Sequence, residues 1–188
     1  MSKRFPGVNE VLHLTTVDST QTLAKTLAQQ GAADATLVWA DRQTKGRGQF
    51  RRKWISQAGG LYVSLIMRPR MEPDRLADLS LNCAGAVARA LARLTGLTMA
   101  VKPPNDVYAS NGSRRGKVCG LLIESSSRAK CVDWLIIGIG INVDNRPALA
   151  TAASLKSLTR RSWGVERTVR AVLAEYFSTV APTASKNI

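Results

Sequence analysis

The feature that most constrains the fold of this chain is the order of its apolar segments. Runs with strand character occupy the middle of the chain, and segments with helical periodicity flank them. The predicted strands cover 36–41, Leu61–Met67, 97–102, 117–125 and 131–143, and the last two are joined like a hairpin. Helices are predicted from Ser19 to Gly31, over 76–94 and over 166–180. This order predicts an α+β fold in which helices cover one face of a mainly antiparallel mixed sheet.

Length and cysteine content limit the class of protein. With 188 residues, the chain is long enough for one domain over 1–188 whose core needs no disulfide bonds. Its three cysteines, Cys83, Cys119 and Cys131, show no metal-ligand spacing and favour buried thiols in a reducing compartment. We find neither a signal peptide nor a run of about 18 apolar residues, so we expect a cytoplasmic protein without membrane contact.

A basic loop over residues 46–54 follows the first predicted strand. It combines Gly46 and Gly48 with four cations and ends at Trp54. Glycines let a ligand approach the backbone, and arginine side chains bind phosphate or carboxylate oxygens in pairs. The net charge of +14 also favours acidic partners, whether nucleotide, nucleic acid or acidic protein. Taken alone, the loop predicts an anion site, a nucleic-acid patch or a solvated basic face.

Further polar clusters lie where apolar segments begin or end. Ser19 and Thr20 fit a helix cap or an anion site, because N–H groups point outward at a helix start. The segment 102–106 fits an ordinary turn, since Pro, Asn and Asp are turn residues. Lys117 could be a solvated strand end, and 138–142 a bulged strand. Each cluster taken separately is explained by ordinary structure.

Taken together, these clusters occur along the chain in the order that is typical of one protein family. The elements, in chain order, are Ser19-Thr20, Gln43, Gly46-Arg47-Gly48, Arg52-Lys53-Trp54, Lys102-x-Pro-Asn-Asp106, Gly116-Lys117-x-x-Gly120-Leu-Leu-x-Glu124, Gly138-Ile-Gly-Ile-Asn142 and Ala153-Ser154-Leu155. From about residue 12 to the final helix, the chain resembles the catalytic domain of biotin–protein ligases. The resemblance implies a biotin–lipoate ligase fold, which is similar to that of class II aminoacyl-tRNA synthetases.

The resemblance implies the activity of an ATP-dependent, AMP-forming biotin–[acetyl-CoA-carboxylase] ligase. ATP and Mg²⁺ would be co-substrates and biotin the substrate. Biotin's carboxylate would attack the α-phosphate of ATP, giving biotinyl-5'-adenylate and pyrophosphate. A lysine of a biotin carboxyl carrier protein domain would then take the biotinyl group and release AMP. Whether the chain forms a homodimer is left open.

The resemblance also implies roles for individual residues. Biotin would be bound by Ser19, Thr20, Gln43, Gly46, Arg47 and Lys117. ATP would be bound by Arg52, Lys53, Trp54, Lys102, Asn105 and Asn142, the last three on phosphates or magnesium. The catalytic residues would be Lys117, Arg47 and Asp106, with Asp106 near the incoming carrier lysine. No protein ligand for a metal ion can be assigned.

The chain departs from the family pattern in two places. Gln49 stands where the family usually has arginine, and Pro103 where it usually has tryptophan. We also expect neither an N-terminal winged helix-turn-helix domain nor a C-terminal SH3-like domain. Without the former, no sequence-specific DNA binding is expected.

Three alternatives to a biotin ligase stay open. A lipoate or octanoate ligase or transferase would share the fold, but usually shows an Arg-Arg-x-x-Gly-Gly-Gly signature that this sequence lacks. A non-catalytic, basic nucleic-acid-binding module would interleave aromatic with basic residues, whereas only 5% of residues are aromatic. A degenerate ligase would bind biotin or the adenylate without turnover.

Overall fold

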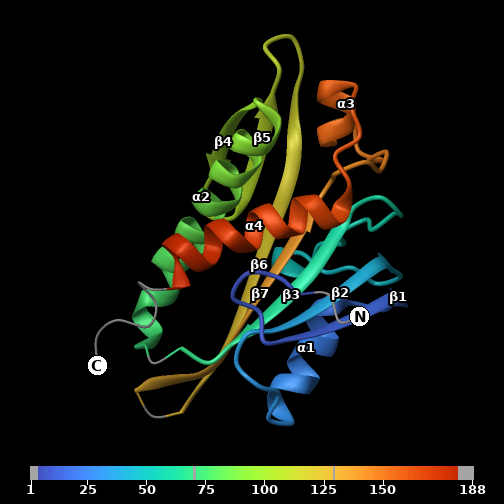
Figure 1. Cartoon of the computed structure of the whole chain (residues 1–188). Coiled ribbons are helices and arrows are strands. Elements are labelled where there is room, and N and C mark those ends of the chain that lie inside the picture. The colour runs from blue at the N-terminus through green and yellow to red at the C-terminus, as the bar shows by residue number, and fades with distance from the viewer. Residues whose placement is uncertain (1–3, 70, 129, 182–188) are drawn as a thin grey trace.

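A computed structural model describes residues 4–69, 71–128 and 130–181. A seven-stranded sheet with the order β1-β2-β3-β7-β6-β5-β4 forms its centre (Figure 1). The strands are β1 Glu10–Val17, β2 Thr36–Gln43, β3 Leu61–Met67, β4 Thr98–Lys102, β5 Asp106–Ser110, β6 Arg115–Arg128 and β7 Cys131–Ile141. The β1–β2 pair is parallel, and the other pairs are antiparallel. The prediction of an α+β fold with a mainly antiparallel mixed sheet is confirmed.

Helices cover both faces of the sheet. The helices are α1 Thr20–Gln29, α2 Leu76–Thr95, α3 Leu155–Thr159 and α4 Val165–Thr179, with short 3₁₀ turns at Gln49–Arg51 and Pro73–Arg75. The main core includes the inner sides of α2 and α4 and one face of the sheet. On the opposite face, Ala24 and Ala28 of α1 pack against Ile66 and Ile136. The expectation that helices cover one face is therefore wrong, because β3 and β7 carry apolar side chains on both faces.

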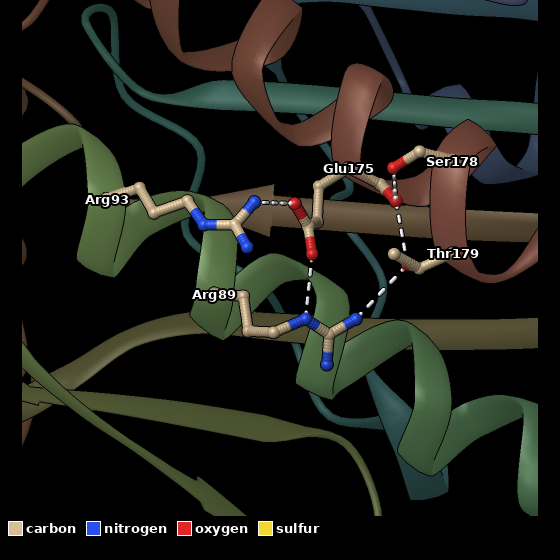
Figure 2. A network of polar contacts seen from close by, with 5 residues as sticks. All are labelled: Arg89, Arg93, Glu175, Ser178 and Thr179. Atoms are coloured by element: carbon tan, nitrogen blue, oxygen red, sulfur yellow. Dashed lines mark hydrogen bonds and ion pairs between the residues drawn. The ribbon is translucent and has the colours of Figure 1, made fainter.

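An ion-pair network joins the two helices that cover the main core. Glu175 on α4 is only 7% exposed, and its carboxylate accepts hydrogen bonds from Arg89 Nε at 2.7 Å and Arg93 Nη1 at 2.6 Å (Figure 2). The two arginines lie four residues apart on α2, and therefore on one side of that helix. Arg89 Nη2 also donates to Thr179 Oγ1 at 3.1 Å. This buried carboxylate is fully paired, which avoids the cost of an isolated buried charge.

Three elements escaped prediction from the sequence. The edge strand β1 is mostly exposed or half-buried, so it lacks the apolar run of a buried strand. β5 follows directly on the Pro103–Asn105 turn and has only five residues, and α3 is equally short. β6 is also longer than predicted, because its polar second half pairs with β7. Local sequence is a weak guide for such short or half-polar segments.

The cysteines are free thiols. Cys83 and Cys119 are buried as expected, and burial raises the pKa of the Cys83 thiol to about 12. Cys131 is only half-buried, so the expectation that all three are buried is wrong for this residue. It is the first residue of β7. Among the described residues, no helix combines the length and apolar character needed to cross a membrane.

Candidate active site

A cavity of about 350 Å³ lies on the face of the sheet that carries α1. Its floor contains Gly138 and Gly140 of β7 and Gly120 of β6, and Gly120 pairs directly with Gly140. A Cβ atom at Gly138 would lie 2.4 Å from Gln21 Oε1, and one at Gly140 would lie 2.6 Å from Trp54 Nε1. The pairing of β7 is regular at these glycines, so 138–142 is not a bulged strand. Glycine is required here by close packing above the floor.

A polar network closes one end of the cavity. Ser19 is the N-cap of α1, where its side chain accepts a hydrogen bond from Thr22 N–H. Thr20 donates its backbone N–H to Gln43 Oε1 at 2.8 Å, and Gln43 Nε2 donates to Ser56 Oγ at 2.8 Å. The N-cap of α1 therefore belongs to the same group of neighbouring side chains as the predicted biotin residues. These residues are Ser19, Thr20 and Gln43. All three line the cavity.

The same network contains two residues to which the sequence analysis gave no role. Ser64 Oγ lies 3.0 Å from both Thr20 Oγ1 and Gln21 Oε1, and Gln21 Nε2 donates to Leu122 O at 3.4 Å. Ser64 is fully buried and Gln21 is 3% exposed. The signals were a serine inside an otherwise apolar strand and a glutamine on the buried face of α1. Buried polar groups of this kind are hydrogen-bonded, and here they shape a cavity wall.

The loop that was predicted to bind anions contributes a further wall of the cavity and contacts β6. Arg47 makes a two-pronged ion pair with Glu124, in which Nη2 lies 2.9 Å from Oε1 and Nη1 lies 3.1 Å from Oε2. Gly46 does not line the cavity, but a Cβ at this position would lie 2.3 Å from the carbonyl oxygen of Trp54. Gly46 therefore lets the loop close on itself, and Glu124 holds the Arg47 guanidinium in one orientation.

Lys117 lines the cavity. Its Nζ is 2.6 Å from Asp106 Oδ1 and 5.4 Å from the centre of the Trp54 ring. Its backbone N–H donates to Thr151 O, and its carbonyl accepts from Ala153 N–H. The side chain is only 27% exposed. The alternative of a solvated strand-end lysine is therefore wrong. The backbone of Lys117 is hydrogen-bonded to the 151–153 segment, and its side chain is paired with Asp106 in the cavity lining.

The residues predicted to meet the nucleotide also line this cavity. They are Arg52, Lys53, Trp54, Lys102, Asn105 and Asn142. Asn105 Nδ2 donates a hydrogen bond to Leu121 O at 2.7 Å, which leaves the side-chain oxygen of Asn105 for a ligand. Asn142 Oδ1 accepts from Asn145 Nδ2 at 2.9 Å, while Asn145 Oδ1 and Trp54 Nε1 are buried with no protein partner. Asn145 was missed, although it follows the predicted Asn142 closely in the sequence. An acceptor and a donor thus stay open beside the cavity.

Charge in the cavity is strongly positive. Among the described residues, its lining contains five cations and one carboxylate, that of Asp106. The described residues contain no group of three or more His, Cys, Asp or Glu that could hold a metal ion. This charge distribution suits an anionic ligand and opposes the build-up of negative charge less than a neutral cavity would.

The tip of the loop has a backbone conformation that is rare for residues other than glycine. Phe50 and Arg51 have φ values of 54° and 59°, and the Phe50 side chain is 83% exposed. Gln49, the first departure from the family pattern, lines the cavity next to this tip. Pro103, the second departure, lies in the exposed β4–β5 turn and does not line the cavity.

The structure combines a mixed sheet with a glycine-floored cavity that is lined by cations. Residues 14–142 match the model of the Biotin/lipoate A/B protein ligase family, and the chain belongs to this family. It is similar to the bifunctional ligase/repressor BirA of Bacillus subtilis, with 41% identity over 70% of this chain and 39% of that protein. It is also similar to the biotin–[acetyl-CoA-carboxylase] ligase of Paracoccus denitrificans, with 36% identity over 71% of this chain and 55% of that protein.

A solved structure shows the same architecture. The biotin protein ligase from Aquifex aeolicus in complex with biotin and ATP superposes with a TM-score of 0.77 and is 34% identical. The match covers 95% of this chain and 73% of that one. The chain spans only about two fifths to just over half of the lengths of the B. subtilis and P. denitrificans proteins.

Proposed function

We propose that this protein is an ATP-dependent biotin–protein ligase that forms biotinyl-5'-adenylate and transfers biotin to a lysine of a biotin carboxyl carrier protein domain. The observation that carries the proposal is that the predicted site residues lie together in space. Residues far apart in the sequence were each assigned to biotin, ATP or catalysis, and all of them except Gly46 line one cavity. The family match and the biotin and ATP named in the similar A. aeolicus complex support it.

The first half-reaction joins two anions. An oxygen of the biotin carboxylate attacks the α-phosphorus of ATP, and the bond from that phosphorus to the bridging oxygen of pyrophosphate breaks. The two substrates repel each other, and negative charge grows on the phosphoryl oxygens in the transition state. Lys117 and Arg47 are fixed cations on neighbouring walls, and they oppose this repulsion. Each gives up or shares its present carboxylate partner when the substrates bind.

The second half-reaction needs a neutral amine. The carrier lysine attacks the carbonyl carbon of the adenylate, and the bond to the AMP oxygen breaks. In the structure, Asp106 is paired with Lys117. When Lys117 turns to the adenylate, the Asp106 carboxylate becomes free to accept the proton that the attacking amine loses. Asp106 therefore acts in transfer rather than in adenylation.

Magnesium fits this site as a companion of the ATP phosphates. Mg²⁺ prefers oxygen ligands, and in nucleotide sites it is commonly bound by substrate phosphates, one or two carboxylates and several waters. The open Oδ1 atom of Asn145 and the oxygen of Asn105 are the neutral acceptors that support this assignment. We further propose a cytoplasmic location, for which the three free thiols are the support.

One assay tests the proposed function. The protein is incubated with ATP, Mg²⁺ and either radiolabelled biotin or radiolabelled lipoate, with a biotin carboxyl carrier domain and a lipoyl domain as acceptors. Biotin-dependent pyrophosphate exchange and label on the biotin carrier alone are expected. Lipoate on the lipoyl domain would assign the chain to the other branch of the family. Pyrophosphate exchange without transfer to either carrier would mean that the protein forms the adenylate but does not biotinylate a protein.

Replacing Glu124 by glutamine tests whether this residue orients Arg47. Glutamine keeps the size of the side chain but loses the charge of the two-pronged pair, so Arg47 samples other orientations. Because the pair is partly exposed, we expect a loss of only ~1 kcal/mol, seen as an about fivefold rise in KM for biotin in pyrophosphate exchange. Glu166→Gln, which alters the ion pair with Arg170 on α4, is the matched control. A lower KM would mean that Glu124 competes with the ligand instead.

Replacing Gln49 by arginine tests the departure in the loop. A neutral hydrogen bond contributes ~1 kcal/mol and a charge-assisted one ~1.5–3 kcal/mol. We therefore expect the arginine variant to release biotinyl-adenylate several-fold more slowly and to label bystander lysines less. The measurements are the adenylate dissociation rate and the biotinylation of a bystander protein. Gln30→Arg, at the exposed C-cap of α1, adds the same charge away from the site. Unchanged values for Gln49→Arg would show that other residues close the loop.

A further inference from the structure

A basic surface lies at the end of the molecule that carries α3. It is formed by the tip of the β5–β6 hairpin, by α3 and by the start of α4, and we call it the α3 surface (Figure 1). Its cations are Arg114, Arg115, Lys156, Arg160, Arg161 and Arg167, all of them exposed. Within the part of the chain that the structure describes, none of the six forms an ion pair with a carboxylate. Asp144 lies close by, but its carboxylate accepts from Ser162 Oγ and from the N–H groups of Trp163 and Gly164.

The α3 surface is continuous with the catalytic cavity. Arg115 stands two residues before Lys117 on β6, a separation of about 7 Å along a strand. Its guanidinium lies 5.3 Å from the ring centre of Tyr108, and Tyr108 lines the cavity. On the other side, Thr151 and Ala152 line the cavity just before α3 begins. A macromolecule that contacts the Arg115 end of this surface therefore lies beside the cavity.

We infer that the α3 surface docks the acidic face of the acyl-acceptor protein and so brings its target lysine to Lys117 and Asp106. The inference rests on the proposed function and adds where the acceptor binds. A target lysine carries positive charge as it approaches, and the cavity ahead of it contains five cations. Repulsion opposes this approach unless acidic residues flank the lysine. Unpaired cations beside the cavity mouth are the matching charges.

The aromatic residues here favour an acidic protein over a nucleic acid. Single-stranded nucleic acid binds where aromatic rings are exposed for bases to stack. Trp163 is only 7% exposed, and the guanidinium groups of Arg161 and Arg167 lie 5.0 and 5.6 Å from its ring centre. The ring therefore holds the arginines in place and offers no free face to a base. Fixed arginines of this kind fit carboxylates in pairs.

A charge-neutralised variant tests the inference. Arg115→Gln, Lys156→Gln and Arg160→Asn are combined, with asparagine chosen because Arg160 has a φ of 58° that asparagine tolerates. The control variant combines Lys25→Gln, Arg42→Gln and Arg128→Gln, which removes three exposed charges at other places. The probe is a biotin carboxyl carrier domain of acidic net charge. Pyrophosphate exchange, transfer to this domain and transfer to hydroxylamine are measured for each protein.

The α3-surface variant should show an about tenfold higher KM for the carrier domain at ~50 mM salt, a gap that closes at ~500 mM salt. Its pyrophosphate exchange and its transfer to hydroxylamine should match those of the control variant. Intact exchange with an unchanged KM for the carrier would overturn the inference, as would an equal rise in the control variant. Loss of binding to a fluorescent 20-nucleotide RNA with an unchanged carrier KM would assign the surface to nucleic acid and also overturn it. An unmodified protein without biotin-dependent exchange would refute the proposed function itself, which is a separate outcome.

Discussion

Replacing Lys117 by alanine should abolish biotin-dependent pyrophosphate exchange while leaving the fold intact. The ammonium group is held 2.6 Å from Asp106 and is only 27% exposed, so in the proposed reaction it would act as a preorganised charge. Removing one preorganised donor of this kind costs ~2.7–4 kcal/mol, or about 10²–10³ in rate, and Lys117 contributes a full charge besides. The exchange rate and the thermal unfolding midpoint of the variant, compared with wild type, measure both effects.

Lys25→Ala is the matched control for this experiment, because it removes an exposed lysine from the surface of α1. It should leave both exchange and unfolding unchanged, as expected for surface substitutions. Normal exchange in Lys117→Ala would refute the catalytic assignment. A collapse of stability in that variant would show that the Lys117–Asp106 pair is structural instead.

Replacing Gly46 by alanine should reduce pyrophosphate exchange at least about a hundredfold, the scale on which a misplaced catalytic group lowers rates. The new Cβ would lie 2.3 Å from the carbonyl oxygen of Trp54 and 2.8 Å from Ser56 Oγ. A backbone atom cannot step aside as a side chain can, so the loop has to open. Opening would move Arg47 and Trp54 away from the cavity together.

The same loop offers the control for this substitution. An alanine Cβ at Gly48 meets its nearest neighbour, Arg52 O, at 3.5 Å, and the φ of −129° there suits any residue. Gly48→Ala should therefore keep near wild-type exchange. Equal losses in the two variants would mean that flexibility of the loop, rather than close packing at Gly46, is what the glycines supply.

The sequence predicted the long, regular elements, and most of the residues that it singled out line one cavity. The helix of α2 and the buried strand Leu61–Met67 were recognisable because burial imposes an apolar period on a long segment. The set of ordered polar motifs pointed to residues that do meet in one cavity. Both successes rest on patterns that many residues share.

The parts that the sequence did not predict depend on contacts between distant segments. Nothing local to α1 indicates that it crosses to the opposite face of the sheet, where Ala24 and Ala28 meet β3 and β7. The pairing of Arg47 with Glu124 joins residues 77 positions apart. Gln21 and Ser64 become a wall of the site only because α1 lies against β3. Such pairings are set by tertiary packing, which overrides or goes beyond local preference.

The glycine floor also sets a length. Gly138, Gly140 and Asn142 occupy alternate positions along β7 and its continuation, so they span about 13 Å at the rise of an extended strand. Gly138 faces Gln21, Gly140 lies beneath Trp54, and Asn142 is the residue proposed to meet the nucleotide. Because backbone geometry fixes this spacing, substitutions of side chains cannot change the distance between the Gly138 and Asn142 ends of the cavity floor. Under the proposed function, an acid with one methylene more or fewer than biotin would therefore place its carboxylate at the wrong distance from the ATP-binding residues, even where its ring still binds.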